Sequence, residues 1–147
     1  MNYGPMLAPV VALVAWTLVM QIWMYATRLP AMRRKGISLK GRRGGRGGAL
    51  DGVIEDEVQW KAHNYNHLLE QPTLFYAIAI ALALLGGGAF WLNLWLAWAY
   101  VALRVVHSLI QATVNIVLWR FLAFSLASFC LLALTLHAAM MLLHAHH

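Results

Sequence analysis

The stretch that decides the fold reads HNYNHLLEQPTLFY over residues 63–76, and it continues into an apolar run that ends at residue 85. Glu70 lies in the middle of this stretch, whereas the other four acidic residues lie between residues 51 and 57. An ionisable side chain at membrane depth is costly unless a partner compensates it. Since Arg104 and Arg120 lie in or beside other apolar segments, we expect Glu70 to meet one of these arginines inside a helical bundle.

The composition is that of an integral membrane protein. Of the 147 residues, 62% are hydrophobic and 11% are charged, whereas about 25% of the residues in a soluble domain are charged. A membrane-spanning helix needs about 20 apolar residues, and four segments meet this requirement, with approximate bounds 5–26, 64–85, 90–112 and 115–143. We therefore predict an all-α fold, a four-helix transmembrane bundle that forms one domain over residues 1–147.

The positive charge is concentrated in one loop. The net charge is +6, and nine of the eleven Lys and Arg residues fall between Arg28 and Lys61. Basic residues beside a span favour the cytoplasmic side and attract anionic lipid headgroups. We therefore expect a cytoplasmic loop over about 27–60, with membrane lipids as partners. The Arg- and Gly-rich run at 42–48 also suggests RNA binding, but it is short and tethered at a membrane, so we expect no nucleic-acid partner.

Polar residues follow a helical spacing on two of the predicted spans. They are His63, Asn66, His67 and Glu70 on the second span, and Arg104, His107, Ser108 and Gln111 on the third. Residues three and four apart share a helix face, and polar stripes in hydrocarbon must face each other or a cavity. This pattern predicts either a polar pocket open to the cytoplasm or a buried network that fixes helix register, and both interpretations stay open.

No metal site is expected. Four histidines lie near the C-terminus, at His137, His144, His146 and His147. Metal-ligating histidines are usually held by a defined second set of hydrogen bonds, which a frayed helix end does not supply. The chain also contains no His-Glu-x-x-His, Walker or Gly-x-Gly-x-x-Gly motif.

Two motifs resemble those of the MAPEG family, the membrane-associated proteins in eicosanoid and glutathione metabolism. Asn64-Tyr65-x-His67-Leu68-x-Glu70-x-Pro72-x-Leu74-Phe75-Tyr76 is similar to the family's helix-two element and closest to a bacterial branch, and Arg104-Val105-Val106-His107-Ser108 resembles its Arg-x-x-His. The resemblance covers nearly the whole chain. It implies a homotrimer in a bacterial inner membrane, with glutathione bound between protomers near the cytoplasmic side and lipophilic substrates arriving from the bilayer.

The resemblance also implies roles for single residues. Glu70 matches the glutamate that receives the amino group of glutathione, and Arg104 matches an arginine near the same ligand. Arg120 is the nearest match to the catalytic arginine that holds the glutathione thiol as thiolate, since a cation beside a thiol lowers its pKa. The remaining candidates for substrate binding are His63, Asn66, His67, His107 and Gln111.

The chain departs from the family's well-studied glutathione users at three positions. Those proteins place Arg where this chain has His63, Asn where it has His67, and Tyr where it has Gln111. A histidine cannot grip a carboxylate with the two parallel hydrogen bonds that an arginine supplies.

The sequence leaves open whether the protein is an enzyme. The first expected function is a glutathione-dependent transferase or peroxidase that acts on lipophilic electrophiles. The alternative is a non-catalytic MAPEG-like subunit or scaffold of a larger membrane complex, whose tryptophan-rich faces contact lipid or quinone. A lipid- or quinone-binding module that uses the same cleft is a third interpretation.

Overall fold

The computed structural model describes residues 3–145, and their regular secondary structure is helical. The helices are α1 Gly4–Arg34, α2 Asp56–Leu68, α3 Pro72–Leu84, α4 Trp91–Ala112 and α5 Val117–Ala145, with short 3₁₀ helices η1 Gly47–Leu50 and η2 Gly87–Ala89. Four stretches are long and apolar enough to cross a membrane: Gly4–Arg34, Asp56–Leu84, Trp91–Ala112 and Val117–His144. The predicted all-α transmembrane four-helix bundle is therefore confirmed.

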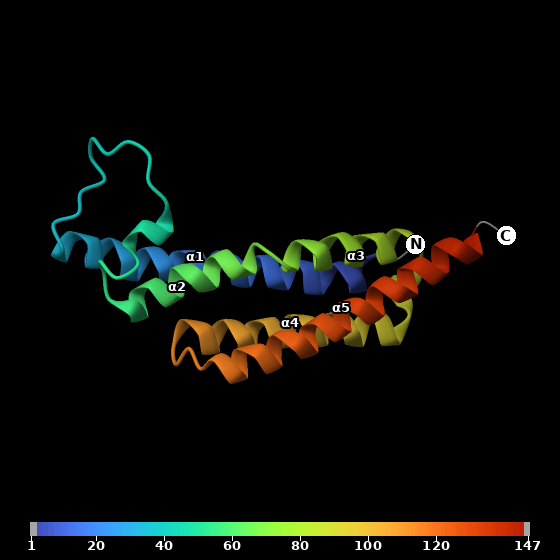
Figure 1. Cartoon of the computed structure of the whole chain (residues 1–147). Helices are drawn as coiled ribbons and strands as arrows, with labels where there is room; N and C mark the ends of the chain where they lie inside the picture. The colour runs from blue at the N-terminus through green and yellow to red at the C-terminus, as the bar shows by residue number, and fades with distance from the viewer. Residues whose placement is uncertain (1–2, 146–147) are drawn as a thin grey trace.

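The helices lie side by side along one long axis (Figure 1). The connection between α1 and α2 and the turn between α4 and α5 lie at the same end of the bundle, and both ends of the described chain lie at the other (Figure 1). Helix α4 packs against α1, α2 and α5, so its inward face meets most of the bundle. This position explains why a polar stripe on α4 becomes buried.

The basic loop is shorter than predicted. Helix α1 continues to Arg34 and α2 begins at Asp56, so the connection covers residues 35–55 instead of about 27–60. A small apolar core of Ala31, Met32, Leu50 and Ile54 explains the difference. Because the last turns of α1 bury Ala31 and Met32 against this connection, they remain helical beyond the apolar span.

The second span is interrupted where one continuous helix was predicted. Helix α2 ends at Leu68, α3 begins at Pro72, and residues 69–71 form a turn between them. Proline has no amide hydrogen, and its ring clashes with the carbonyl of the residue four positions earlier, here Leu68. Pro72 is favourable as the first residue of a new helix, so the chain breaks and restarts at this point. The break positions the site described next.

Candidate functional site

Arg104 is the central residue of the site and has no exposed surface. Its Nη2 donates to Nδ1 of His67 at 3.0 Å and to the carbonyl oxygen of His67 at 3.1 Å. His67 lies in the last turn of α2, where unpaired carbonyls carry a partial negative charge that favours a cation. The end of α2 at the Pro72 break therefore supplies the compensation that this buried guanidinium needs.

His67 and His107 form an aromatic layer beside Arg104. Their rings stack with centroids 4.7 Å apart and an interplanar angle of 26°. The ring of Phe124 on α5 meets His67 edge-on at 5.6 Å and lies 5.7 Å from the guanidinium carbon of Arg104. Because an arginine can only donate hydrogen bonds, Nδ1 of His67 must accept. His67 is therefore neutral in this arrangement, with its proton on Nε2.

The expected ion pair of Glu70 with an arginine is wrong within the protomer. Glu70 is exposed, and its carboxylate makes no hydrogen bond or ion pair to the residues that the structure describes. Among the residues described, an ion pair joins Arg34 to Glu55, and Nε2 of His63 lies 3.0 Å from Oδ1 of Asp51. The reason is the turn at residues 69–71, which carries Glu70 to the surface. Glu70 remains within electrostatic range of both Arg104 and His67.

The polar stripe expected on the second span does not face α4 as a whole. His63 and Asn66 are exposed, and only His67 of the predicted set bonds to Arg104. His63 Nε2 lies 3.0 Å from Oδ1 of Asp51, so His63 is tied to the basic connection instead. Asn64 takes the inward position on α2 with 1% of its surface exposed, a placement that the i, i+3, i+4 pattern missed.

The polar stripe on α4 is buried along its whole length. Arg104, His107, Ser108 and Gln111 all lie inside the protomer. Several of their polar atoms have no hydrogen-bond partner among the described residues: Nε and Nη1 of Arg104, Nδ1 of His107, Oγ of Ser108 and Oε1 of Gln111. The side-chain Oδ1 and Nδ2 of Asn64 also have no hydrogen-bond partner among the described residues. Buried polar groups normally pair with protein or water, so we expect ordered water to pair with these atoms.

Arg120 is the site arginine that retains an exposed surface. It is half-buried in the first turn of α5, and its Nη1 donates to Oδ1 of Asn115 at 2.6 Å. Asn115 has a positive φ of 53° in the turn before α5, a conformation that asparagine tolerates better than most residues. Nε of Arg120 has no hydrogen-bond partner among residues 3–145. Arg120 lies within electrostatic range of His67 and His107.

Three residues that sequence reasoning missed hold the Pro72 break in place. The hydroxyl of Tyr100 on α4 donates to Oε1 of Gln71 at 3.2 Å, and Nε2 of Gln71 donates to Oγ of Ser128 on α5 at 2.8 Å. Tyr100 lies one helical turn before Arg104 on the same face, so extending the α4 stripe toward its N-terminus would have found it. Nothing in the sequence signals the contact between Gln71 and Ser128.

The histidines near the C-terminus take part in local contacts. Nδ1 of His137 lies 2.7 Å from Oδ1 of Asn93, and Nδ1 of His144 lies 2.7 Å from the carbonyl oxygen of Met140. His146 and His147 lie outside the described residues. Among the described residues no three His, Cys, Asp or Glu side chains gather as a metal site would require.

The comparisons with known proteins agree with the motifs. The family model described as the MAPEG family matches residues 6–140. No curated protein and no solved structure matches the chain. The family match covers all the residues placed above in the site, and it confirms the resemblance carried by the motifs on α2 and α4.

Proposed function

The chain belongs to the MAPEG family, and on this premise we propose that it is a membrane-bound, glutathione-dependent transferase or peroxidase acting on lipophilic electrophiles. The observation that carries the proposal is the pair of accessible charges beside the buried Arg104 layer. Glu70 offers an exposed carboxylate without a hydrogen-bond or ion-pair partner among residues 3–145, and half-buried Arg120 keeps part of its surface exposed. Glutathione has an ammonium group and a thiol of complementary chemistry.

The proposed reaction needs one cation at the thiol. Arg120 would favour the glutathione thiolate, and the thiol proton would pass to water. The thiolate sulfur would then attack the electrophilic carbon of the second substrate, and the leaving group would depart with the electron pair of the broken bond. Glu70 would hold the ammonium group and so fix the position of the sulfur.

Arg104 and His107 take an indirect part in this proposal. Both are buried, and Arg104 already bonds to His67, so neither presents a free surface to a ligand of the single protomer. They would act as positioning residues that hold the end of α2, and with it Glu70, in place. His67, at the edge of the layer and half-buried, is the member of that group best placed to contact glutathione.

The proposed assembly is a homotrimer whose basic connection faces the cytoplasm. Large apolar side chains are exposed along α5, among them Phe121, Phe129 and Leu136. In a bilayer such faces must meet lipid tails or neighbouring helices, and Glu70 would then face an adjoining protomer. The charge of the connection supports the cytoplasmic orientation.

A non-catalytic subunit of a larger membrane complex is the second candidate. Two residues that were expected to bind glutathione make contacts within the protomer instead, and this favours the second candidate. His63 bonds to Asp51, and Arg104 bonds to His67. In that case the polar layer would serve helix packing alone, and glutathione would not bind.

Conjugation of a reactive aryl halide separates the two functions. The purified protein should accelerate the reaction of the halide with glutathione, and Arg120→Leu should remove that acceleration. Arg33→Leu, an exposed arginine at the end of α1, is the matched control and should retain it. A wild-type rate equal to the uncatalysed rate, with a panel of lipophilic electrophiles, would favour the subunit function.

A further inference from the structure

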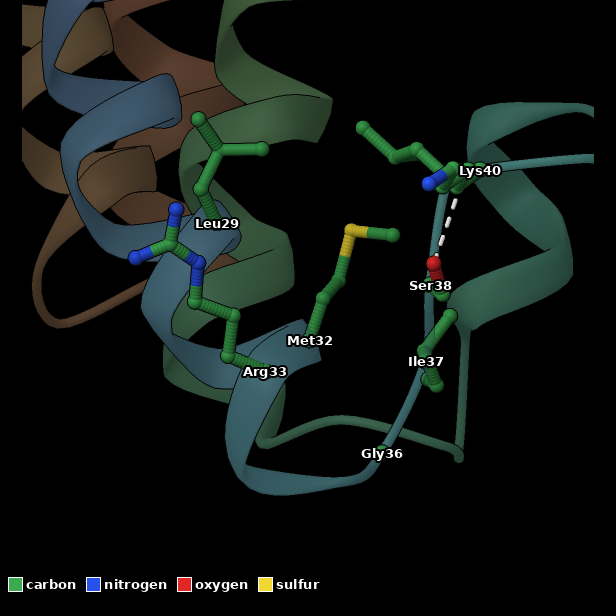
Figure 2. A pocket seen from close by; sticks show the side chains of 8 residues that line it. Leu29, Met32, Arg33, Gly36, Ile37, Ser38 and Lys40 are labelled. Atoms are coloured by element: carbon green, nitrogen blue, oxygen red, sulfur yellow. Dashed lines mark hydrogen bonds between the residues drawn. The ribbon is translucent and has the colours of Figure 1, made fainter.

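Two adjoining cavities lie between the end of α1 and the chain that follows it. The first, of about 560 Å³, is lined by the last turns of α1 and residues 36–40. Figure 2 shows Leu29 and Arg33 on the helix, with the side chain of Met32 directed toward the segment that carries Ile37 and Ser38. The second, of about 520 Å³, extends under residues 42–47. Both include Leu29, Met32, Ile37 and Leu39 in their linings, so they form one continuous feature, here called the α1 groove.

The floor of the α1 groove is apolar and rests on a packed core. Met32 and Leu50 line the groove and belong to the small core that also contains Ala31 and Ile54. Leu39, another lining residue, leaves 64% of its surface exposed. Tyr25, Leu29 and Val53 line the groove and are also exposed. An apolar surface left open in this way is typical of a binding site for an apolar ligand.

The rim of the groove is cationic. Residues 28–55 contain eight Lys and Arg but only two acids. Two of the arginines are occupied: Arg28 donates to the carbonyl of Gly47 at 2.7 Å, and Arg34 pairs with Glu55 at 3.6 Å. The side chains of Arg42, Arg43 and Arg46 line the groove and make no hydrogen bond or ion pair to the rest of the described chain. The guanidinium groups of these three lining residues therefore remain available to an anion.

The length of α1 would place the groove at the depth of the lipid headgroups. Helix α1 has 31 residues and is about 46 Å long at 1.5 Å per residue, whereas the hydrocarbon core of a bilayer is about 30 Å thick. Trp23 and Tyr25 are of a type that favours the interface; Trp23 precedes the groove and Tyr25 is the first residue of α1 that lines it. In Figure 1 this end of α1 reaches past the turn between α4 and α5.

We propose that the α1 groove binds an anionic glycerophospholipid. Its phosphate would lie between Arg42, Arg43 and Arg46, which can each donate two parallel hydrogen bonds to phosphate oxygens. The upper part of its acyl chains would cover Leu29 and Leu39. RNA fits less well, because single-stranded nucleic acid needs aromatic side chains on which bases stack, and this floor is mostly aliphatic. The inference is independent of the proposed glutathione chemistry, since the groove shares no residue with that site.

Native mass spectrometry of the detergent-purified protein tests the proposal. Phosphatidylglycerol should bind at least about tenfold more tightly than phosphatidylcholine with the same acyl chains. The double variant Arg42→Gln, Arg43→Gln should weaken phosphatidylglycerol binding about tenfold or more, because each basic residue near an anionic lipid contributes severalfold. The matched double variant Arg34→Gln, Lys35→Gln removes the same charge outside the groove and should change binding less than about threefold.

A third variant separates a lipid from a free phosphate. Leu39→Asn changes an exposed residue of the floor, so it should leave the fold intact while weakening phosphatidylglycerol binding severalfold. Glycerol phosphate, which has no acyl chains, should bind weakly and equally to wild type and Leu39→Asn. Equal binding of the two phospholipids, or equal losses in the two double variants, would overturn the proposal. RNA binding that depends on Arg42 and Arg43, with phosphatidylglycerol binding unaffected by them, would also overturn it.

Discussion

Arg104 carries a full charge with no exposed surface, and its partners decide how the site is built. The guanidinium is held by the ring and the carbonyl of His67 at the end of α2, and the exposed carboxylate of Glu70 has no hydrogen-bond or ion-pair partner among the described residues. A direct ion pair with Glu70 would have used both charges inside the protomer. The residues therefore separate into a pair that is hydrogen-bonded within the protomer, Arg104 and His67, and an accessible pair, Glu70 and Arg120.

Stability measurements should distinguish these two pairs. Arg104→Met leaves the carbonyl and Nδ1 of His67 without their donor, and such a loss costs about 1–3 kcal/mol. Glu70→Gln changes an exposed residue, so the free energy of unfolding should change by less than about 0.5 kcal/mol. Unfolding in a mixed-micelle titration measures both variants. Equal losses of unfolding free energy in Arg104→Met and Glu70→Gln would indicate that Glu70 and Arg104 form an ion pair.

The hydrogen bond from Arg104 also fixes the tautomer of His67. Because Nη2 of Arg104 can only donate, Nδ1 of His67 should be unprotonated and Nε2 protonated at neutral pH. Nitrogen-15 chemical shifts of the histidine rings report this directly. In Arg104→Met the preference should disappear and both tautomers should be observed. A proton on Nδ1 in the wild-type protein would mean that Arg104 bonds elsewhere.

Among the elements, the break between α2 and α3 carries Glu70 to the surface. It is fixed by Pro72 and by the hydrogen bonds from Tyr100 to Gln71 and from Gln71 to Ser128. These contacts join α4 and α5 across the break. The turn that exposes Glu70 is therefore a packed part of the structure, held from two sides.

Substitutions of Tyr100, Gln71 and Ser128 should lower the free energy of unfolding by different amounts. Tyr100→Phe and Ser128→Ala each remove one bond to Gln71, and each should cost about 1 kcal/mol. Gln71→Leu removes both bonds at once, so its cost should exceed that of either single variant. Unfolding measurements on the three variants test the order. A smaller loss for Gln71→Leu than for Tyr100→Phe would show that Gln71 is not the link.

The connection between α1 and α2 is fixed by a carboxylate. Gln59 Nε2 donates to Oδ1 of Asp51 at 2.5 Å, and His63 lies 3.0 Å from the same oxygen. These contacts, with that of Gln59 the larger, hold the pKa of Asp51 below its usual value of 3.8. Because folding lowers the pKa of Asp51, its contacts stabilise the fold at pH values above the ordinary pKa of an aspartate. This stabilisation is lost as the pH falls through the folded-state pKa.

A carboxyl NMR titration tests this contact. Asp51 should titrate below 3.8, and Gln59→Met should raise its pKa more than His63→Gln does. An unchanged pKa of Asp51 in Gln59→Met would show that Gln59 is not its main partner.

At the scale of the molecule, one end of the bundle carries both proposed binding features. The basic connection and the turn before Arg120 lie at that end (Figure 1). The α1 groove is the proposed site of a lipid headgroup, and the charged site is the proposed site of a water-soluble thiol compound. Exposed apolar faces on α4 and α5, including Trp95 and Phe129, leave room for further protomers around this arrangement.

The oligomer is the prediction that belongs to the whole molecule. Native mass spectrometry in a mild detergent should give a species of three times the chain mass. Phe129→Asn, on the exposed face of α5, should reduce that species, because an amide in an apolar helix interface loses packing and solvation. Leu39→Asn, in the basic connection, should leave it unchanged. A monomer as the stable species in several mild detergents would contradict the proposed trimer.

Periodicity and composition predicted the features of the fold that depend on the local sequence, namely the spans and the buried face of a helix. The four apolar runs predicted four spans, and the spacing of Arg104, His107 and Gln111 predicted one buried face of α4. The direction of Glu70 could not be predicted in the same way, because it depends on how the backbone turns before Pro72. The contact of His63 with Asp51 joins residues twelve positions apart through a loop, so it depends on tertiary structure that no helical spacing encodes.

The most direct test of the proposed function is the ultraviolet absorbance of glutathione thiolate bound to the detergent-purified protein at neutral pH. The proposal predicts a thiolate band that saturates with glutathione, persists in Arg33→Leu and disappears in Arg120→Leu. Glu70→Gln should require more glutathione for saturation but keep the band. No thiolate band at millimolar glutathione, or an undiminished band in Arg120→Leu, would contradict the assignment of this site.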